Sequence, residues 1–265
     1  KMRKILNFIY RFKIFKRIIP SLLKIVIRLF NIKEIKIIHN DLAFLINPRN
    51  PIDREIYLKD KYELEQINFL TNIIKSNGIQ NFIDIGAHMG FYSINLSKQK
   101  IKIYAFEPII ENYNQLEKNI LINKIENINK FNCALSNVKK SVVMWVSNKD
   151  KTGGFSIYNQ TDNELQKYEK KKLHTRTIQS EIGDNLLDIN KSKIAIKIDV
   201  ERHEEEVLLG IDKLLKNNEI IIQIEIFNER KNRIFAMLKY RKYHLINTIG
   251  KDYYFTNFKN DEFKK

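Results

Sequence analysis

The stretch Phe82-Ile83-Asp84-Ile85-Gly86-Ala87-His88-Met89-Gly90 decides the fold of this chain. A short apolar run predicts a buried strand, and the two glycines bracket a turn into a helix. Glycine adopts backbone angles that a Cβ resists, and it lets the backbone approach a ligand closely. Nucleotide-like cofactors bind at such a turn, at the C-terminal edge of a parallel sheet. Packing alone also produces this pattern, so further segments are needed.

The spacing of the two glycines narrows the class of cofactor. Gly86 and Gly90 are separated by three residues, and His88 stands where a dinucleotide-binding fingerprint needs its second glycine. That glycine normally allows contact with the pyrophosphate. The spacing therefore argues against an NAD-dependent oxidoreductase.

A second acidic segment, Tyr104-Ala105-Phe106-Glu107-Pro108, follows the first. It predicts that Glu107 ends the next strand. A carboxylate in that place accepts hydrogen bonds from both ribose hydroxyls of an adenosine-type cofactor. The alternative is a solvated acid at a strand end.

A third segment combines a lysine with several acids, in Lys197-Ile198-Asp199-Val200-Glu201-Arg202-His203-Glu204. Lys197 and Asp199 share one face of a strand, because side chains alternate with a period of two. Glu225 ends the following apolar run and is expected beside Asp199. Such a cluster shifts proton affinities and supplies a base. For Glu204, Glu205 and Glu206 we favour acids that stabilise a helix N-terminus.

The order of apolar runs predicts the fold class. Strands and helices alternate, which is typical of a parallel sheet with crossover helices. The expected strands are Asn81–Ile85, Lys102–Phe106, Asn129–Cys133, Ile194–Ile198 and Ile220–Ile226. Residues 243–256 then read as a hairpin around Gly250. We expect an α/β, Rossmann-like class I methyltransferase fold, with a mostly parallel seven-stranded sheet that a C-terminal antiparallel hairpin closes.

Taken together, these segments resemble the FkbM-type methyltransferase family. The resemblance covers roughly residues 60–257 and rests on the order and spacing of its motifs. They are Asp-Ile-Gly-Ala-His-Met-Gly-Phe-Tyr-Ser at 84–93, Ala-Phe-Glu-Pro at 105–108, Asn-Cys-Ala-Leu-Ser at 132–136, Lys-Ile-Asp-Val-Glu at 197–201, Glu204 and Glu225. The resemblance implies S-adenosylmethionine as methyl donor and O-methylation of a sugar, a lipid-linked glycan or a natural product.

The resemblance also implies roles for particular residues. The expected cofactor-binding residues are Asp84, Gly86, Ala87, Gly90, Glu107, Asn132, Cys133 and Ala134. Asp199, Glu201 and Glu225 would face the acceptor, with Asp199 as the base or its positioner. We expect Lys197 or His203 to stabilise oxyanion charge. Asp199, His203 and Glu225 are metal-ligand types without a close-set ligand motif, so no metal is expected.

At two positions the sequence departs from the residues that are usual in this family. Arg202 stands where members usually have glycine, and His88 where they often have asparagine. We expect Arg202 to affect the turn that aims Glu201, or to contact an anionic acceptor.

The distribution of charge separates an N-terminal segment from the rest of the chain. Residues 1–33, here called the basic arm, contain ten Lys or Arg and no acid, so the rest carries only +6 of the net +16. We expect a basic helical arm and small strand pair over 1–59 and a methyltransferase domain over 60–265. Phe8, Phe12, Phe15 and Ile19 fall on one helical stripe. No apolar run reaches the ~20 residues that cross a bilayer.

The basic arm allows three interpretations. A helix lying on anionic lipid is favoured, because phenylalanines and cations interleave. A packing helix or dimer contact and a nucleic-acid attachment are the others. With Cys133 as the single cysteine, no disulfide forms within the chain. We expect a cytoplasmic protein, membrane-associated through the arm, and the sequence does not fix its oligomeric state.

These observations predict an S-adenosylmethionine-dependent methyltransferase that acts on a small-molecule or glycan acceptor. Two alternatives stay open, a nucleic-acid methyltransferase and a non-catalytic scaffold with a methyltransferase fold. Nucleic acid is the less favoured acceptor, because the body lacks a basic, aromatic recognition stripe.

Overall fold

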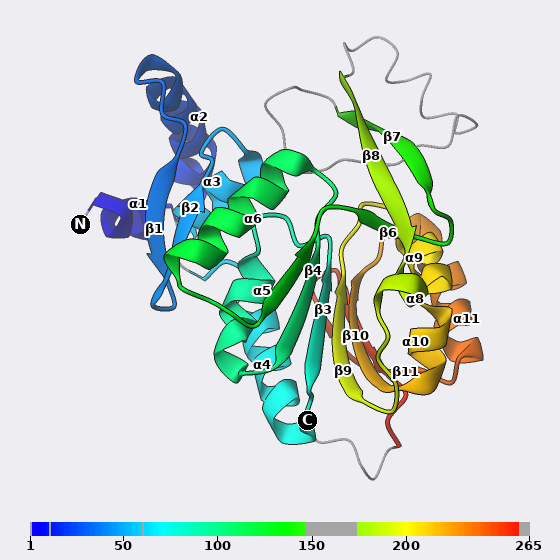
Figure 1. Cartoon of the computed structure of the whole chain (residues 1–265). Coiled ribbons are helices and arrows are strands. Elements are labelled where there is room, and N and C mark those ends of the chain that lie inside the picture. The colour runs from blue at the N-terminus through cyan, green and yellow to red at the C-terminus, as the bar shows by residue number, and fades with distance from the viewer. Residues whose placement is uncertain (1, 11, 60, 147–173, 260–265) are drawn as a thin grey trace.

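A seven-stranded sheet forms the centre of the computed structural model, which describes residues 2–10, 12–59, 61–146 and 174–259 (Figure 1). The strand order is β11-β12-β10-β9-β3-β4-β5. Five neighbouring strands are parallel: β3 (Asn81–Ile85), β4 (Lys102–Phe106), β5 (Ile128–Phe131), β9 (Lys193–Ile198) and β10 (Glu219–Glu225). The hairpin of β11 (His244–Ile249) and β12 (Asp252–Thr256) adds its second strand antiparallel to β10. The predicted fold class is confirmed.

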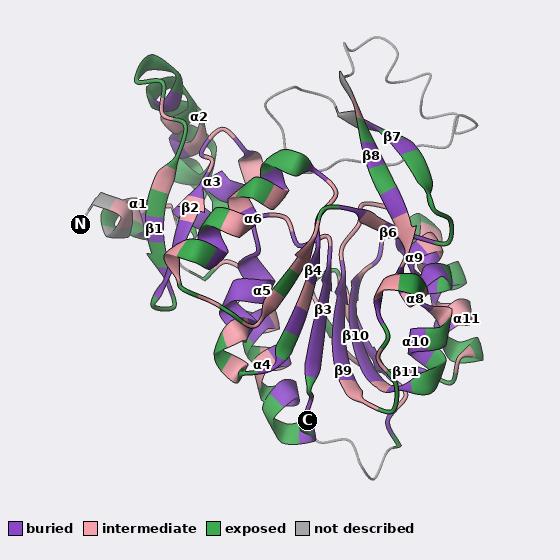
Figure 2. Ribbon diagram, viewed as in Figure 1, coloured by how far each residue is buried: buried purple, intermediate pink, exposed green. Residues whose placement is uncertain are grey.

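Helices cover both faces of this sheet, as Figure 1 shows. One face packs against α4 (Leu64–Asn77), α5 (Phe91–Leu96) and α6 (Ile110–Ile122). The other packs against α8 (Gly183–Leu186), α9 (Glu204–Gly210), α10 (Asp212–Asn217) and α11 (Lys231–Tyr240). The strands β3, β9 and β10 are buried almost throughout (Figure 2), which explains their nearly continuous apolar sequences.

Alternation along each strand supplies the two cores. Phe82 and Ala195 point to the face that carries α4 and α5, whereas Ile83 and Ile196 point to the face that carries α9 and α10. The period of two therefore lets one short run such as β3 fill both cores.

The third predicted strand, Asn129–Cys133, is wrong at its C-terminal end. β5 ends at Phe131, and the chain continues into β6 (Ala134–Ser136), which joins a second sheet of order β6-β8-β7 with β7 (Lys140–Val146) and β8 (His174–Ile182). The reason is a tertiary contact, because the Asn132 amide donates to the carbonyl oxygens of Glu107 (2.9 Å) and Pro108 (3.2 Å). The chain there contacts the β4 end instead of continuing the ladder. The expected turn at Thr152-Gly153-Gly154 lies outside the described residues.

The N-terminal elements pack beside α6. They are α1 (Met2–Ile9), α2 (Lys13–Leu29), β1 (Ile35–His39), β2 (Leu42–Ile46) and α3 (Pro51–Leu58). Amides from α6 hold β2, since Asn119 Oδ1 accepts from the Leu45 N–H at 2.7 Å and Asn123 Oδ1 from the Ala43 N–H at 2.9 Å. The β1–β2 hairpin and α3 share a core with α4 and α5.

The predicted stripe of Phe8, Phe12, Phe15 and Ile19 is not one helical face. The helix is interrupted between α1 and α2, and Phe12, the N-cap residue of α2, has an extended backbone. Phe8 and Phe12 instead meet edge-to-face across this break, with ring centroids 5.9 Å apart. No helix in the described part of the chain is long and apolar enough to cross a membrane.

Two glycines with positive φ, one on each side of β3, allow a matched test of the close backbone approach at Gly86. Gly78 (φ 64°) has open space around the position of a Cβ, whereas a Cβ on Gly86 (φ 86°) would lie 2.0 Å from the Asp199 carbonyl oxygen. Gly78→Ala should lower the free energy of unfolding by ~1–2 kcal/mol, the cost of left-handed backbone alone. Gly86→Ala should cost at least about twice as much, because backbone must also move. Urea denaturation measures both, and equal losses would contradict the close approach.

Candidate functional site

The glycine bend, residues 86–90, is tied to the ends of neighbouring strands. The N–H groups of Gly86 and Ala87 both donate to the Phe106 carbonyl oxygen, at 3.0 and 2.9 Å. The Asp199 N–H donates to the Ile85 carbonyl oxygen at 3.0 Å. Because β3, β4 and β9 are parallel neighbours, their C-terminal ends meet at this bend. The segments that follow these strands therefore line one space.

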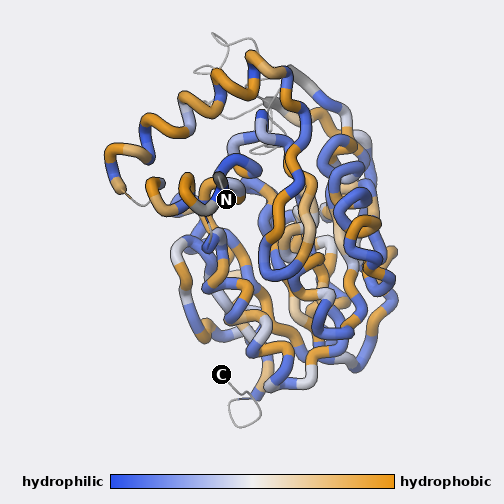
Figure 3. The backbone as a smooth tube through the Cα atoms, turned by 90° about the vertical axis from the view of Figure 1, so that its left-hand side faces the viewer, coloured by the Kyte–Doolittle hydropathy of each residue, from blue (hydrophilic) through white to orange (hydrophobic). Residues whose placement is uncertain are grey.

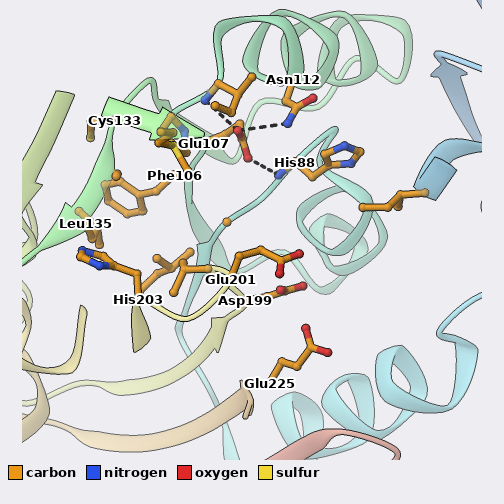
Figure 4. Close-up of a pocket in the computed structure, with 18 of the residues that line it drawn as sticks. His88, Phe106, Glu107, Asn112, Cys133, Leu135, Asp199, Glu201, His203 and Glu225 are labelled. Atoms are coloured by element: carbon orange, nitrogen blue, oxygen red, sulfur yellow. Dashed lines mark hydrogen bonds between the residues drawn. The ribbon is translucent and has the colours of Figure 1, made fainter. Parts of the chain in front are cut away.

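A cavity of about 280 Å³ opens at this edge of the sheet (Figure 4). That volume is near the lower end of the range for small-molecule sites, ~300 Å³. Its walls combine apolar side chains, among them Phe106, Ile109 and Met144, with acidic ones. The five acids are Glu63, Glu107, Asp199, Glu201 and Glu225. No lysine or arginine is among the described residues that line it.

Glu107 faces the glycine bend, as its expected role requires. Its carboxylate accepts from the His88 N–H (2.8 Å) on one oxygen and from the Ile109 N–H (2.8 Å) on the other, with the Asn112 amide 3.3 Å away (Figure 4). Burial raises the pKa of Glu107, and the charge of His88 and these hydrogen bonds oppose that rise. The carboxylate is thus fixed in direction before any ligand binds.

The expected cofactor-binding residues divide into two groups. Gly86, Glu107, Cys133 and Ala134 line the cavity, whereas Asp84, Ala87, Gly90 and Asn132 do not. Asp84 is buried and accepts from the Ser93 hydroxyl (2.6 Å) and N–H (3.2 Å), so it ties β3 to α5. Burial raises the pKa of the Cys133 thiol to about 11, which keeps it neutral.

Opposite Glu107, the carboxyls of Asp199, Glu201 and Glu225 gather at the ends of β9 and β10 (Figure 4). The register explains their meeting, since Ile198 pairs with Ile224 and the next residues are Asp199 and Glu225. Each of these two carboxyls shifts the pKa of the other. The sequence prediction that Glu225 lies beside Asp199 is therefore confirmed by the register.

Lys197 lies behind Asp199 and does not line the cavity. Its Nζ is 3.0 Å from Asp199 Oδ2 and 4.8 Å from the centroid of the Tyr92 ring. Burial acts to raise the pKa of Asp199, but the Lys197 ammonium outweighs it and holds that pKa below its ordinary value. Burial and the Asp199 charge raise the pKa of Glu225 to about 8. At neutral pH the pair thus holds one proton, mainly on Glu225.

His203 lies on the far wall, away from the carboxyl group cluster. Its Nε2 is 3.0 Å from the Ser136 hydroxyl and its Nδ1 is 3.5 Å from Glu206. The described residues contain no group of three His, Cys, Asp or Glu placed to hold a metal ion. The side chains of His203 and Asp199, which the sequence suggests as potential metal ligands, therefore do not meet at one point.

The turn before α9 keeps a glycine-like shape although it contains Arg202. Glu201 and Arg202 have φ angles of 52° and 76°, in the region that favours glycine. The Arg202 guanidinium lies over the Phe227 ring at 5.5 Å, outside the cavity. The backbone N–H of Arg202 donates to Glu204 Oε1 at 2.9 Å. Glu201 therefore still faces the cavity.

The acids at the start of α9 are not simple solvated helix caps. Glu204 is buried under the preceding turn, and burial raises its pKa to about 7. Glu205 is also buried, and it pairs with Arg233 at 2.7 Å and Arg230 at 3.8 Å. The sequence predicts acids that stabilise the N-terminus of this helix. It does not reveal that the first turn of α9 packs against the body of the protein, which buries Glu204 and Glu205.

Sequence reasoning also missed Tyr62 and Glu63, which line the cavity from the start of α4. Burial raises the pKa of Glu63. His88 was noted only as a departure, yet its Nε2 lies 3.0 Å from the Asn50 amide and 3.8 Å from buried Asp53 on α3. No local pattern marks these residues, because the tertiary fold brings α3 and α4 to the sheet edge.

Comparison with protein families gives a match over residues 84–245, more than half of the chain, to the family described as the methyltransferase FkbM domain. The chain belongs to the FkbM methyltransferase family. The resemblance predicted from the motifs is thereby confirmed, as is S-adenosylmethionine as the expected methyl donor. No curated protein matches the sequence significantly.

Several solved structures share the arrangement at low similarity. A Pyrococcus abyssi tRNA (uracil-54, C5)-methyltransferase, solved with S-adenosyl-L-homocysteine, has a TM-score of 0.48 and 10% identity over 84% of this chain and 43% of that protein. The M. jannaschii protein TYW2, solved with AdoMet, has a TM-score of 0.44 and 14% identity over 84% of each chain. This chain thus spans less than half of the P. abyssi enzyme. The fold is assigned from the sheet order and from the family.

The cavity fits S-adenosylmethionine in two respects. Glu107 presents a fixed carboxylate beside the bend, where a ribose would be held, and Cys133 and Ala134 provide a small apolar edge. The five acidic side chains in the lining favour a cationic ligand over a pyrophosphate.

The shared proton of Asp199 and Glu225 predicts a pH effect on stability. Because folding raises the pKa of Glu225 from 4.5 to about 8, the Glu225 contribution to stability is full at low pH and is lost as the pH rises through about 8. Glu225→Gln should thus gain stability relative to wild type between pH 5 and pH 8.5 (roughly the ends of this window). Urea denaturation across this range measures the trend.

Glu219→Gln is the matched control, because Glu219 lies at the other end of β10 with its side chain 45% exposed. A relative stability of Glu225→Gln that does not change with pH would contradict the raised pKa.

Proposed function

We propose that this protein transfers a methyl group from S-adenosylmethionine to a hydroxyl group of a sugar, a glycan or a natural product. The observation that carries the proposal is the cavity with Glu107 fixed on one side and the paired carboxyls of Asp199 and Glu225 on the other. One side suits a ribose, and the other suits removal of a proton.

S-adenosylmethionine, when bound, supplies a methyl group on a positively charged sulfonium. The chain must therefore hold the acceptor in line and accept its proton, and alignment alone contributes up to ~7–11 kcal/mol to such reactions. Glu107 holds the ribose hydroxyls, and Cys133 and Ala134 border the adenine. The carboxylates across the cavity favour the nearby positive charge.

Asp199 is the residue that accepts the proton of the acceptor hydroxyl in this proposal. It is ionised at neutral pH because Lys197 lies 3.0 Å away. Glu225, which keeps its own proton, lies beside Asp199 at the end of the neighbouring strand β10. Lys197 is a positioning residue, because it acts through Asp199 and does not line the cavity.

The electrostatics of the cavity bear on the class of acceptor. A nucleic acid would bring phosphates towards five acidic side chains, with no lysine or arginine in the described lining to receive them. A neutral polyol meets no such repulsion, and carboxylates are good acceptors for its hydroxyl groups. These charges favour a carbohydrate-like acceptor over nucleic acid.

Replacement of Glu107 tests the cofactor half of the site. Glu107→Gln should weaken S-adenosylmethionine binding by roughly 10- to 150-fold, because hydrogen bonds to a charged group contribute about 1.5–3 kcal/mol. Titration calorimetry on the folded variant measures the affinity. Glu117→Gln, on the outer face of α6 with its side chain 45% exposed, is the control for the lost charge. If the cofactor neither binds nor raises the melting temperature of the wild-type protein, a non-catalytic scaffold is favoured.

Replacement of Asp199 tests the acceptor half. Asp199→Asn should lower methyl transfer by ~10²–10⁴-fold with cofactor affinity near that of the wild type, because a placed base contributes that much. The assay follows labelled methyl from S-adenosylmethionine into glycan and glycolipid extracts, with mass spectrometry of the products. Asp188→Asn, at an exposed position, is the control. Unchanged transfer by Asp199→Asn would remove this residue from the mechanism, and methylation of RNA but not of glycans would replace the acceptor class.

A further inference from the structure

The helix α2 is apolar on two sides, and only one of them packs on the body. Ile19 and Ile27 are buried and Leu23 packs against the core. A second set, on another side, is 45–75% exposed and consists of Ile14, Ile18, Leu22, Ile25 and Leu29. At about 100° per residue, this set falls within one arc of roughly 80°. We call it the outer stripe.

Four cations follow the outer stripe along one edge. Lys13, Arg17, Lys24 and Arg28 are all exposed, and at about 100° per residue they occupy a neighbouring arc of roughly 60°. No acid occurs anywhere in residues 1–33. The outward surface of α2 is therefore an apolar band beside a band of positive charge. Figure 3 shows hydrophobic and hydrophilic residues alternating along this helix.

The first helix extends this surface and fixes it to the body. Ile5 and Phe8 of α1 are about 60% exposed, at 59% and 61%. Arg3 donates to the carbonyl oxygens of Ile56 (3.1 Å) and Tyr57 (3.1 Å), near the end of α3. Ile52, near the start of the same helix, lines the cavity. The eight-residue helix α3 thus connects the arm directly to the site.

We propose that the outward surface of α1 and α2 lies in the plane of a membrane that contains anionic lipids. The outer stripe enters the acyl region while the cations stay among the headgroups, which is the arrangement of interfacial amphipathic helices. The helix lies on the bilayer rather than across it, since α2 has 17 residues and five of them are exposed cations. The site, connected through α3, is thereby held near the membrane surface.

The cations and the outer stripe of α2 argue against the two other partners considered for the basic arm, a second copy of the chain and a nucleic acid. In a twofold contact the same surface meets itself, so the exposed cations of two copies would be brought together. A nucleic acid would bind the cations but would leave the outer stripe in water, because aliphatic side chains offer phosphates no contact. An anionic lipid surface satisfies both bands.

The test is co-sedimentation of the full chain with vesicles of phosphatidylcholine alone or with about one third phosphatidylglycerol. We expect binding to the anionic vesicles only, and a decline in binding as salt is raised. K13Q/R17Q/K24Q/R28Q should weaken binding by more than about 100-fold, because each cation near the surface contributes about fivefold. L22S/I25S/L29S should weaken it with all cations present, which a purely ionic contact would not show.

The matched control is K75Q/K102Q/K213Q/K239Q, which removes the same charge from exposed positions of the body and should leave binding unchanged. Equal loss with this control, or equal binding to both kinds of vesicle, would overturn the proposal. Light scattering that shows dimers broken by L22S/I25S/L29S, without vesicle binding, would make the surface a self-contact. RNA binding that depends on the arm, again without vesicle binding, would assign it to nucleic acid. The affinity for S-adenosylmethionine is measured on every variant. It reports on the cavity alone, so a failure of membrane binding can be distinguished from a failure of the proposed methyl transfer.

Discussion

The close approach of Gly86 to Asp199 is the constraint on which the site depends. A side chain at residue 86 would overlap the Asp199 carbonyl oxygen, so β3 and β9 end in direct backbone contact. That contact places Asp199 beside the glycine bend. The same bend holds Glu107 from the other side through the His88 N–H. Both halves of the cavity are thus positioned by one turn that requires the absence of a Cβ.

Negative and positive side chains gather in different parts of this protein, which its net charge does not reveal. The net charge is +16, but the cavity is lined by acids; Lys197 is engaged behind Asp199, and Lys251 lies 3.7 Å from Glu225. The free cations of α2 lie on the outer surface of the arm. A cationic methyl donor and an anionic membrane therefore attract different parts of the same chain, and neither attraction opposes the other.

The sequence predicted the sheet well where the signal is local. The bounds expected for the first two parallel strands agree with β3 and β4, because each is a short apolar run bordered by turn residues. It failed where a distant contact decides the path. Asn132 leaves the sheet to donate to the carbonyl oxygens of Glu107 and Pro108, and the arm forms two helices, α1 and α2, in place of one.

The sequence by itself determined which acids stand at strand ends, because the order of apolar runs and turns fixes where each parallel strand stops. It therefore located Glu107, Asp199 and Glu225. Only the tertiary structure decided that Asp199 is ionised while Glu225 keeps its proton, and that Glu63 joins them from α4. Proton affinity and exposure depend on neighbours in space, and those neighbours come from elements that are far apart along the chain.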